Sequence, residues 1–298
     1  PGAAPLVARG HTCLSTAGAA LRHGGAMADT PSPAPAGSLY LVDGSGFIFR
    51  AFHALPLMTR PDGTPVNAVL GFTNMLMKLL AEMRAEALAV VFDAKRETFR
   101  NQIYPAYKAT RPEPPEELKP QFALIREATA AFNVPALELE GFEADDLIAT
   151  YARLARAEGR AVTIVSSDKD LMQLVRPGVS LYDPLKYRPI GPAEVIEKFG
   201  VPPERIVDYL ALVGDAVDNV PGVDKVGPKT AAKLIQQYGS LDEVMAHADD
   251  FDRLRRGHAC PLSSPATGAM QPAMPDIAAL GKRLWHVRRV HRIPVGNR

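Results

Sequence analysis

The stretch SLYLVD, residues 38–43, is a short apolar run that ends in an aspartate. The same pattern recurs in ALAVVFD, which ends at Asp93, and in AVTIVSSDKD, which ends at Asp168 and Asp170. Short apolar runs bounded by polar residues are typical of buried strands. Each of the three runs therefore predicts a strand with acidic side chains at its carboxyl end.

Helical segments separate these runs. Residues 67–86, NAVLGFTNMLMKLLAEMRAE, carry apolar side chains at three- and four-residue spacing, and a second amphipathic segment starts at Asp145. Alternating strands and helices predict an α/β fold with a mainly parallel sheet flanked by helices. Ligands of such sheets bind beyond the carboxyl ends of the strands. We therefore expect Asp43, Asp93 and Asp168 to share one site, although any one of them alone would be read as an ordinary loop aspartate.

A second concentration of acids lies in EGFEADDLIATYARLA, residues 140–155. Acidic residues in the first turn of a helix complement its dipole. That effect accounts for one or two of the four carboxylates, but not for all, because neighbouring carboxylates repel one another. On a helix Glu143 and Asp146 share a face, while Asp145 points to one side. The crowding indicates a functional acidic site.

The remaining acids join this set through their spacing. Asp168 and Asp170 share a side in extended backbone, and GDAVDN, residues 214–219, adds two aspartates three residues apart. Such a cluster is strongly destabilising unless cations neutralise it. Ligation by oxygen alone indicates Mg²⁺ or Mn²⁺, and more than one ion. Two ions about 4 Å apart form a clamp for phosphodiester chemistry. The predicted ligands, nine if Asp145 faces inward, are Asp43, Asp93, Glu143, Asp145, Asp146, Asp168, Asp170, Asp215 and Asp218.

A basic segment follows Asp93 directly. Residues 95–111 hold one acid, Glu97, against five basic side chains, with three aromatic residues interleaved: Lys95, Arg96, Arg100, Lys108 and Arg111, and Phe99, Tyr104 and Tyr107. Cations for phosphates and rings for bases suit a single nucleic-acid strand. A solvated basic helix is the alternative, and the Pro-rich PEPPEELKP that follows predicts an exposed connection.

The stretch PGVDKVGPKTAAKLI, residues 221–235, nearly matches the phosphate loop of nucleotide-binding proteins. Pro228 displaces the lysine by one position and no apolar strand precedes it, so an ATP site is rejected. We predict two short helices joined by a glycine hairpin, with a tight turn at Gly222 and Gly227. Backbone N–H groups and three lysines would then hold the phosphates of duplex DNA; a helix C-cap followed by a new helix is the alternative. The lysines are Lys225, Lys229 and Lys233.

The two ends differ from the middle of this 298-residue chain. The net charge is +1 overall, +7 in residues 251–298 and +1 in residues 1–38, which leaves −7 for residues 39–250. Any argument for nucleic acid must therefore rest on local pattern rather than net charge. We expect 1–38 to be a disordered or non-native leader, with Met27 as a start, and 251–298 to be a disordered or truncated basic tail. With only two cysteines we do not expect a disulfide framework, and no apolar run reaches the roughly 18 residues of a membrane span.

Five motifs in one order resemble the 5′→3′ exonuclease domain of bacterial DNA polymerase I, within the 5′-nuclease or flap endonuclease superfamily. The resemblance covers about residues 39–250. Ser167 stands where the family often has glycine, and the segment after residue 250 matches neither further nuclease helices nor a polymerase domain. The motifs are VDGSGFIFRAFHALP, VVFDAKRETFRNQIYPAYKATRP, EGFEADDLIAT, SSDKDLMQLV and GDAVDNVPGVDKVGPKTAAKLI.

The resemblance implies a PIN-like nuclease core over 39–204, a helical arch near 95–120, and a helix–three-turn–helix or helix-hairpin-helix DNA-binding element over 205–250. It implies a first metal region formed by Asp43, Asp93, Glu143, Asp145 and Asp146, and a second formed by Asp168, Asp170, Asp215 and Asp218. It implies contacts to the threaded strand and scissile phosphate from Arg50, Lys95, Arg100, Tyr107, Lys108 and Arg111. The hairpin would grip duplex DNA, with a bound K⁺, through Gly222, Lys225, Gly227, Lys229, Thr230 and Lys233.

The activity implied is Mg²⁺-dependent hydrolysis of DNA at 5′ ends, nicks or flaps, with Mn²⁺ able to substitute and RNA primers as further substrates. Asp43, Lys95, Arg100, Lys108 and Arg111 would be catalytic. A monomer in the bacterial cytoplasm, associated with the nucleoid and lacking a polymerase domain, is expected. A non-catalytic module that binds branched DNA and a PIN-like RNase are the alternatives, although the glycine hairpin and the basic segment favour DNA.

Overall fold

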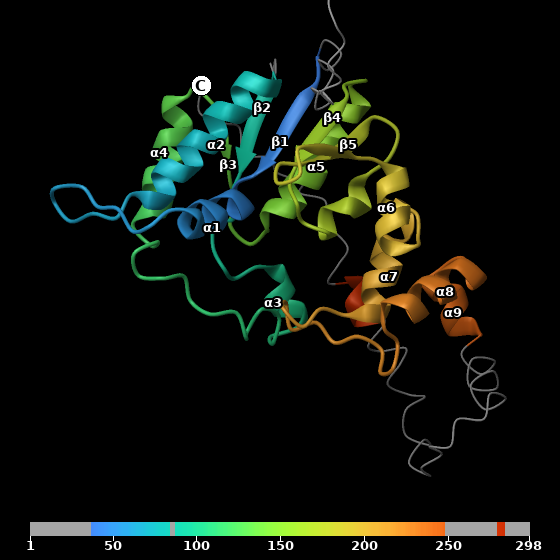
Figure 1. Ribbon diagram of the computed structural model, residues 1–298. Coiled ribbons are helices and arrows are strands. Elements are labelled where there is room, and N and C mark those ends of the chain that lie inside the picture. Colours follow the sequence, from blue (N-terminus) through green and yellow to red (C-terminus); the bar gives the residue numbers. More distant parts are fainter. Residues whose placement is uncertain (1–36, 84–86, 248–278, 284–298) are drawn as a thin grey trace, which may run out of the picture. The chain divides into compact units, whose positions relative to one another are not determined.

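The computed structural model describes residues 37–83, 87–247 and 279–283 (Figure 1). Almost all of the expected leader and basic tail lies outside these residues. The described chain is built around a six-stranded sheet in the order β3-β2-β1-β4-β5-β6. All neighbouring strands are parallel except β5 and β6, which form an antiparallel hairpin. The strands are β1 (Leu39–Asp43), β2 (Ala87–Val91), β3 (Ala136–Leu137), β4 (Val162–Val165), β5 (Val179–Asp183) and β6 (Arg188–Ile190).

The three strands expected from the sequence, β1, β2 and β4, lie side by side at the centre of the sheet. Their apolar runs are nearly continuous because helices cover both faces of a parallel sheet. Along β1, Tyr40 and Val42 face one hydrophobic cluster, and Leu41 faces the other. The alternation of side chains along a strand produces this division. The predicted mainly parallel α/β fold is confirmed.

Helices α1 (Gly44–Ala54), α2 (Asn67–Met83) and α4 (Gln121–Ala131) pack on one face of the sheet. Helices α5 (Ala144–Ala157) and α7 (Ile206–Val213) pack on the other. The predicted helix over residues 67–86 is α2, and the one starting at Asp145 is α5. The remaining helices are α3 (Phe99–Ile103), α6 (Pro192–Phe199), α8 (Pro228–Tyr238) and α9 (Leu241–Ala246), with 3₁₀ turns η1 (Asp170–Leu174) and η2 (Pro203–Arg205).

The expected helical arch is only partly helical. Within residues 95–120 the described helix is α3, five residues long, and turns and extended chain follow it. Proline removes a backbone donor and clashes with the preceding helical turn. The segment therefore cannot continue α3, because it carries Pro105, Pro112, Pro114, Pro115 and Pro120.

The glycine hairpin connects α7 to α8, as expected, but its two glycines act differently from the prediction. A Cβ on Gly222 would lie 2.1 Å from the carbonyl oxygen of Val213, so this position requires glycine for close backbone approach. Gly227 has extended backbone and is the N-cap of α8, with open space around it. Of the two glycines, only Gly222 is therefore required for the close approach of the hairpin backbone to the end of α7.

The five described residues near the C-terminus, 279–283, are helical and pack against this region. Leu280 contacts the hydrophobic cluster that includes α7, and Lys282 Nζ lies 2.8 Å from Asp242 Oδ2 and 3.7 Å from Asp208 Oδ1. A short part of the sequence predicted as tail is thus ordered against α7 and α9. None of the helices in 37–83, 87–247 and 279–283 is long and apolar enough to cross a membrane.

A buried glutamine joins two of the helices that cover the sheet. Gln121 Oε1 accepts hydrogen bonds from the backbone N–H groups of Ala68 at 2.7 Å and Val69 at 3.1 Å. These donors belong to the first turn of α2, where no partner within the helix exists. Gln121 Nε2 donates to Asn67 Oδ1 and to the carbonyl of Glu117, each at 2.9 Å. The side chain therefore acts as an N-cap supplied by α4 to α2.

We expect Gln121→Met, which keeps the length of the side chain but not its hydrogen bonds, to lower the free energy of unfolding by about 2–3 kcal/mol. The loss would arise because buried donors at the start of α2 are left without acceptors. Urea unfolding followed by circular dichroism measures it. The control is Gln237→Met on the exposed face of α8, for which a change within about 0.5 kcal/mol is expected. Equal effects of the two changes would contradict the capping role.

Candidate metal centre

Seven of the nine predicted ligands line one cavity of about 220 Å³ at the carboxyl edge of the sheet. They come from the end of β1, the residues after β2 and β4, the first turn of α5, and the loop between α7 and the hairpin. We call this the acidic cavity. Its carboxylates are Asp43, Asp93, Glu143, Asp145, Asp168, Asp170 and Asp218.

Two predicted ligands lie elsewhere. Asp146 is fully buried and accepts a bidentate pair of hydrogen bonds from Arg100, at 2.7 and 3.0 Å. Asp215 pairs with Lys169 and accepts the backbone N–H of Val217 at 2.6 Å, which shapes its own loop. The spacing rule put Glu143 and Asp146 on one face correctly, since both contact Arg100. It did not show that Asp145, rather than Asp146, faces the cavity.

Two serines orient the carboxylates, and the sequence reasoning missed both. Ser166 Oγ donates to Asp43 Oδ2 at 2.9 Å and accepts the backbone N–H of Asp168 at 3.0 Å. Ser45 Oγ donates to Asp93 Oδ2 at 2.7 Å. The available signal was a hydroxyl within two residues of a strand-end aspartate. Without the strand order, that signal cannot show which carboxylate each hydroxyl faces.

Charge repulsion and burial raise the pKa of several of these acids. Burial, followed by repulsion from Asp168 and Asp93, raises the pKa of Asp43 to about 6. Burial and repulsion from Asp168 raise the pKa of Asp170 to about 7. Asp145 has a pKa well above its usual value for the same reasons, with Asp168 and Asp43 as its neighbours. The cavity is therefore short of positive charge.

The residues present fit hard divalent cations. Asp170 Oδ1 is buried and receives no hydrogen bond within the described residues, and the nearest ion-pair partner, Lys169 Nζ, is 3.7 Å away. The cavity is lined chiefly by carboxylates and by no His or Cys side chain, which suits Mg²⁺ or Mn²⁺. In the described part of the chain no three acidic, His or Cys side chains converge as a complete metal cage. Mg²⁺ does not need one, because it usually keeps several waters and takes one or two carboxylates.

Three of the predicted basic residues line the acidic cavity and are paired with carboxylates. Arg100 contacts Asp146, Lys108 Nζ lies 3.0 Å from Glu143 Oε1, and Arg111 pairs with Asp218. Burial would raise the pKa of Glu143, but Lys108 and Arg100 hold it below its usual value. Arg100 is 4% exposed, so it supports the start of α5 rather than facing solvent.

The other predicted strand-binding residues are placed differently. Lys95 is exposed, pairs with Glu140 at 2.9 Å, and lines a neighbouring cavity of about 500 Å³. Tyr107 is buried, with its hydroxyl 3.2 Å from Glu143 Oε2 and 3.3 Å from Asp218 Oδ2. Its ring is therefore not available to stack on a base. Arg50 faces a third cavity, on the far side of Asp43.

The base of the basic segment is tied to the loop that precedes the hairpin. The backbone N–H of Lys108 donates to the carbonyl of Asp218 at 2.8 Å, and Asn219 Nδ2 donates to the carbonyl of Ala106 at 2.8 Å. Beyond this loop, Lys225, Lys229 and Lys233 are exposed, while Thr230 is half-buried in the first turn of α8. The structure thus brings the basic segment to the acidic cavity and leaves the hairpin lysines facing solvent.

The mainly parallel sheet with carboxylates gathered at its carboxyl edge defines an α/β protein with a candidate metal centre. Two family models agree: the 5′-3′ exonuclease N-terminal resolvase-like domain matches residues 38–200, and the 5′-3′ exonuclease C-terminal SAM fold matches residues 201–267. The second match extends beyond residue 250, where the resemblance read from the motifs stopped. The chain belongs to the 5′-3′ exonuclease family.

Relatives in sequence support this assignment, and solved structures share the fold. The chain is 60% identical over 226 residues to DNA polymerase I of Rhizobium leguminosarum, covering 73% of this chain but 22% of that protein. It is 46% identical to a 5′-3′ exonuclease of Aquifex aeolicus, covering 72% of this chain and 75% of that protein. The fold is similar to T5 5′-exonuclease with bound divalent metal ions (TM-score 0.64, 22% identity, 83% of this chain and 89% of that one). It is also similar to the catalytic core of Rad2 with DNA substrate (TM-score 0.51, 17% identity, 75% and 68%).

We expect Arg100→Met to lower the free energy of unfolding by about 3–5 kcal/mol, because it leaves the carboxylate of Asp146 buried without its partner. The double change Arg100→Met with Asp146→Leu should recover most of this loss, since neither member of the pair is then left buried and charged without its partner. Urea unfolding of the two single variants and the double variant measures the interaction. If the double variant lost as much free energy of unfolding as the two single variants together, Arg100 and Asp146 would not stabilise each other.

We expect metal-free protein to become less stable as pH rises from about 5 to 8. A carboxyl whose folded pKa is about 7, as for Asp170, binds its proton more tightly in the folded state than in the unfolded state. Stability is therefore gained by protonation and lost as pH rises through the folded pKa. Asp170→Asn should raise the Tm of metal-free protein at pH 8 by about 3 °C or more. Differential scanning calorimetry in EDTA tests this, and an unchanged or lower Tm would contradict it.

Proposed function

We propose that the protein is a Mg²⁺-dependent 5′→3′ exonuclease and 5′ flap endonuclease that hydrolyses DNA phosphodiesters. The observation that carries the proposal is the convergence of seven carboxylates on one cavity beside a basic segment. Acids alone would indicate only a cation site. Cationic side chains on the same cavity add the means to bind a phosphate, and membership of the exonuclease family makes a nucleic acid the substrate class.

Different carboxylates of the cavity would hold the two ions. Asp43, Asp93, Glu143 and Asp145 would serve one, and Asp168, Asp170 and Asp218 the other, each ion keeping several waters. When bound, the ions supply Lewis acidity at the phosphate and a nucleophilic water at neutral pH. Asp146 and Asp215 are left out of this set, because neither of them lines the acidic cavity.

Lys108 and Arg111 would stabilise the negative charge that develops on the phosphate, since both line the acidic cavity. Arg100 would act through Asp146 by fixing the first turn of α5, which presents Glu143 and Asp145. Lys95, from its exposed position, would guide the strand toward the cavity. These separate roles differ from the shared catalytic role that the resemblance implied for Lys95, Arg100, Lys108 and Arg111.

The hairpin would hold the duplex part of the substrate. Lys229 and Lys233 lie one turn apart on α8, and Lys225 precedes them in the hairpin. Exposed lysines and helix N-terminal N–H groups contact phosphates without reading sequence, which suits binding to duplex of any sequence. A K⁺ ion at this hairpin, a monomeric state, action on RNA primers and a place at the bacterial nucleoid complete the proposal.

We expect a 5′-labelled flap duplex to be cut near its junction in Mg²⁺ and not in EDTA, and to be bound without cutting in Ca²⁺. Asp170→Asn should lower the cleavage rate by about 100-fold or more while leaving binding in Ca²⁺ within a few-fold. Gel analysis of products and fluorescence anisotropy measure the two quantities.

The matched control is Glu197→Gln on the exposed face of α6, which should cut at the wild-type rate. Unchanged cleavage by Asp170→Asn would remove the two-ion argument. Binding without cutting by the wild type would favour the branched-DNA-binding module, and preference for an RNA flap would favour an RNase.

A further inference from the structure

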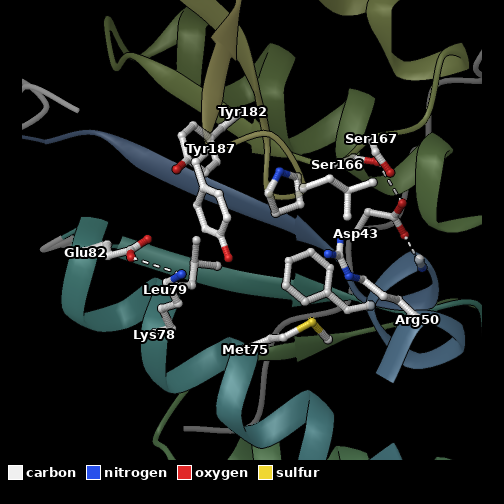
Figure 2. A pocket seen from close by; sticks show the side chains of 14 residues that line it. Asp43, Arg50, Met75, Lys78, Leu79, Glu82, Ser166, Ser167, Tyr182 and Tyr187 are labelled. Carbon is white, nitrogen blue, oxygen red and sulfur yellow. Dashed lines mark hydrogen bonds and ion pairs between the residues drawn. The ribbon is translucent and has the colours of Figure 1, made fainter. Parts of the chain in front are cut away.

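Asp43 and Asp93, which both end central strands, are held in different ways. Asp43 is 8% exposed, and it accepts hydrogen bonds from Ser166 Oγ at 2.9 Å and from the backbone N–H of Gly46 at 3.2 Å (Figure 2). Its strand, β1, is paired on both sides, with β2 and with β4. Asp93 is exposed, and the outer neighbour of its strand is β3, which has only two residues. The sheet therefore restrains Asp93 less than it restrains Asp43.

The carboxylate of Asp93 is oriented by the first turns of two helices. Ser45 Oγ donates to Asp93 Oδ2 at 2.7 Å, and the backbone N–H of Ala144 donates to Asp93 Oδ1 at 2.7 Å. A carboxylate oxygen accepts about two hydrogen bonds, so each oxygen retains a lone pair for a cation. These two bonds fix the carboxylate only if the backbone that carries it is fixed as well.

The pairing of β2 with β3 does not fix that backbone. Among the described residues this pairing ends at Phe92, whose N–H donates to the carbonyl of Leu137 at 2.8 Å. The next peptide, which carries the carbonyl of Asp93, lies beyond the two residues of β3. A backbone carbonyl in such a position needs an acceptor's partner from elsewhere in the fold.

Arg126, on α4, supplies this partner. Its Nη2 donates to the carbonyl oxygen of Asp93 at 3.0 Å, and its guanidinium lies 5.0 Å from the centre of the Phe92 ring. Its Nε donates to Glu138 Oε2 at 2.6 Å, and its Nη1 donates to the carbonyl of Phe122 at 3.1 Å. Each nitrogen of the guanidinium therefore has an acceptor. A planar fork of donors can join several groups in one fixed geometry, and here it joins α4 to the end of β2.

These contacts differ from those of a side chain that binds phosphate. The side chain of Arg126 is 27% exposed, and Glu138 balances its charge. Lys95, on the same side of the sheet edge, is 62% exposed. Arg126 lines the neighbouring cavity of about 500 Å³ but not the acidic cavity. It therefore reaches the candidate metal centre only through Asp93.

We propose that Arg126 is a positioning residue for the metal centre, which holds the backbone of Asp93 so that its carboxylate faces the acidic cavity. The inference rests on the proposed function in taking Asp93 as a ligand of a divalent cation. Side chains that orient metal ligands through hydrogen bonds contribute roughly 10–100-fold to metal affinity. Cation binding at the sheet edge thus depends on the packing of α4, a helix that contributes no ligand.

The test measures Mn²⁺ binding by the protein without DNA, by isothermal titration calorimetry. Arg126→Met should weaken binding about tenfold. Arg126→Lys keeps the charge but cannot serve three acceptors at once, so it should weaken binding about threefold. The matched control is Arg153→Met on the exposed face of α5, which should bind Mn²⁺ as the wild type does.

A double-mutant cycle shows whether Arg126 acts through Asp93. In an Asp93→Asn background, Arg126→Met should change the Mn²⁺ affinity by less than about twofold, because the carboxylate that it positions is absent. A tenfold loss that persists in this background overturns the proposal. So does a wild-type Mn²⁺ affinity in Arg126→Met, including one accompanied by a lower Tm, which would indicate a role in stability alone. If Arg126→Met does not fold, Arg126→Lys in both backgrounds decides the same question.

Flap binding in Ca²⁺ separates positioning from direct contact with DNA. Arg126→Met should bind a flap duplex within a few-fold of the wild type, and weaker flap binding with an unchanged Mn²⁺ affinity would overturn the proposal in favour of a phosphate contact. The proposed function fails separately if wild-type protein binds Mn²⁺ and does not cut flaps, because the effect of Arg126 on Mn²⁺ binding would stand. Wild-type protein that binds no Mn²⁺ overturns both.

Discussion

Mutual repulsion of carboxylates at one edge of a parallel sheet is the constraint on which the rest of this structure depends. The acids lie there because parallel strands all deliver their carboxyl ends to one edge, and Asp43, Asp93 and Asp168 follow adjacent central strands. Burial at this edge, together with repulsion from neighbouring carboxylates, raises the pKa of Asp43 to about 6 and that of Asp170 to about 7. This arrangement lowers the stability of the fold at neutral pH, so its presence indicates a function rather than a contribution to stability.

The surrounding elements distribute positive charge and hydrogen-bond donors around this edge. In the interior, Arg100 forms an ion pair with Asp146. At the cavity, Lys108 pairs with Glu143, and Arg111 pairs with Asp218. Lys169 pairs with Asp215. Asp146 and Asp215, which do not line the acidic cavity, serve the scaffold, and the seven acids that line it form the candidate metal centre. One class of residue thus has two roles, which depend on its place in the fold rather than on its position in the sequence.

The contacts between residues 104–111 and 215–220 connect the two halves of the site. The basic segment comes from the chain between β2 and α4, and the second loop from the start of the hairpin element. Lys108 and Asn219 both adopt positive φ values, 56° and 55°, where the two loops exchange hydrogen bonds. Non-glycine residues adopt this conformation at a cost. The two loops therefore hold each other, and they place phosphate-binding side chains over the carboxylates. Asp43 lines both the acidic cavity and the neighbouring cavity that has mostly apolar walls.

The three central strands, helices α2 and α5, and the gathering of aspartates at one edge of the sheet could be predicted from the sequence alone. The spacing of apolar residues and the aspartates at the ends of strands are local signals, and the motifs that carry them also identified the family. It also pointed to nine acids as one set, and seven of them line one cavity. The partner of each acid was decided only by the tertiary structure: Asp145 and Asp146 are neighbours of the same type, and only the packing of α3 against α5 shows that Arg100 takes one and leaves the other. The burial of Tyr107, the hydroxyl of Ser166 on Asp43, and the cavity that Arg50 lines likewise arise from segments far apart in the chain. No local pattern specifies such contacts, since they depend on strand order and on which helix faces meet.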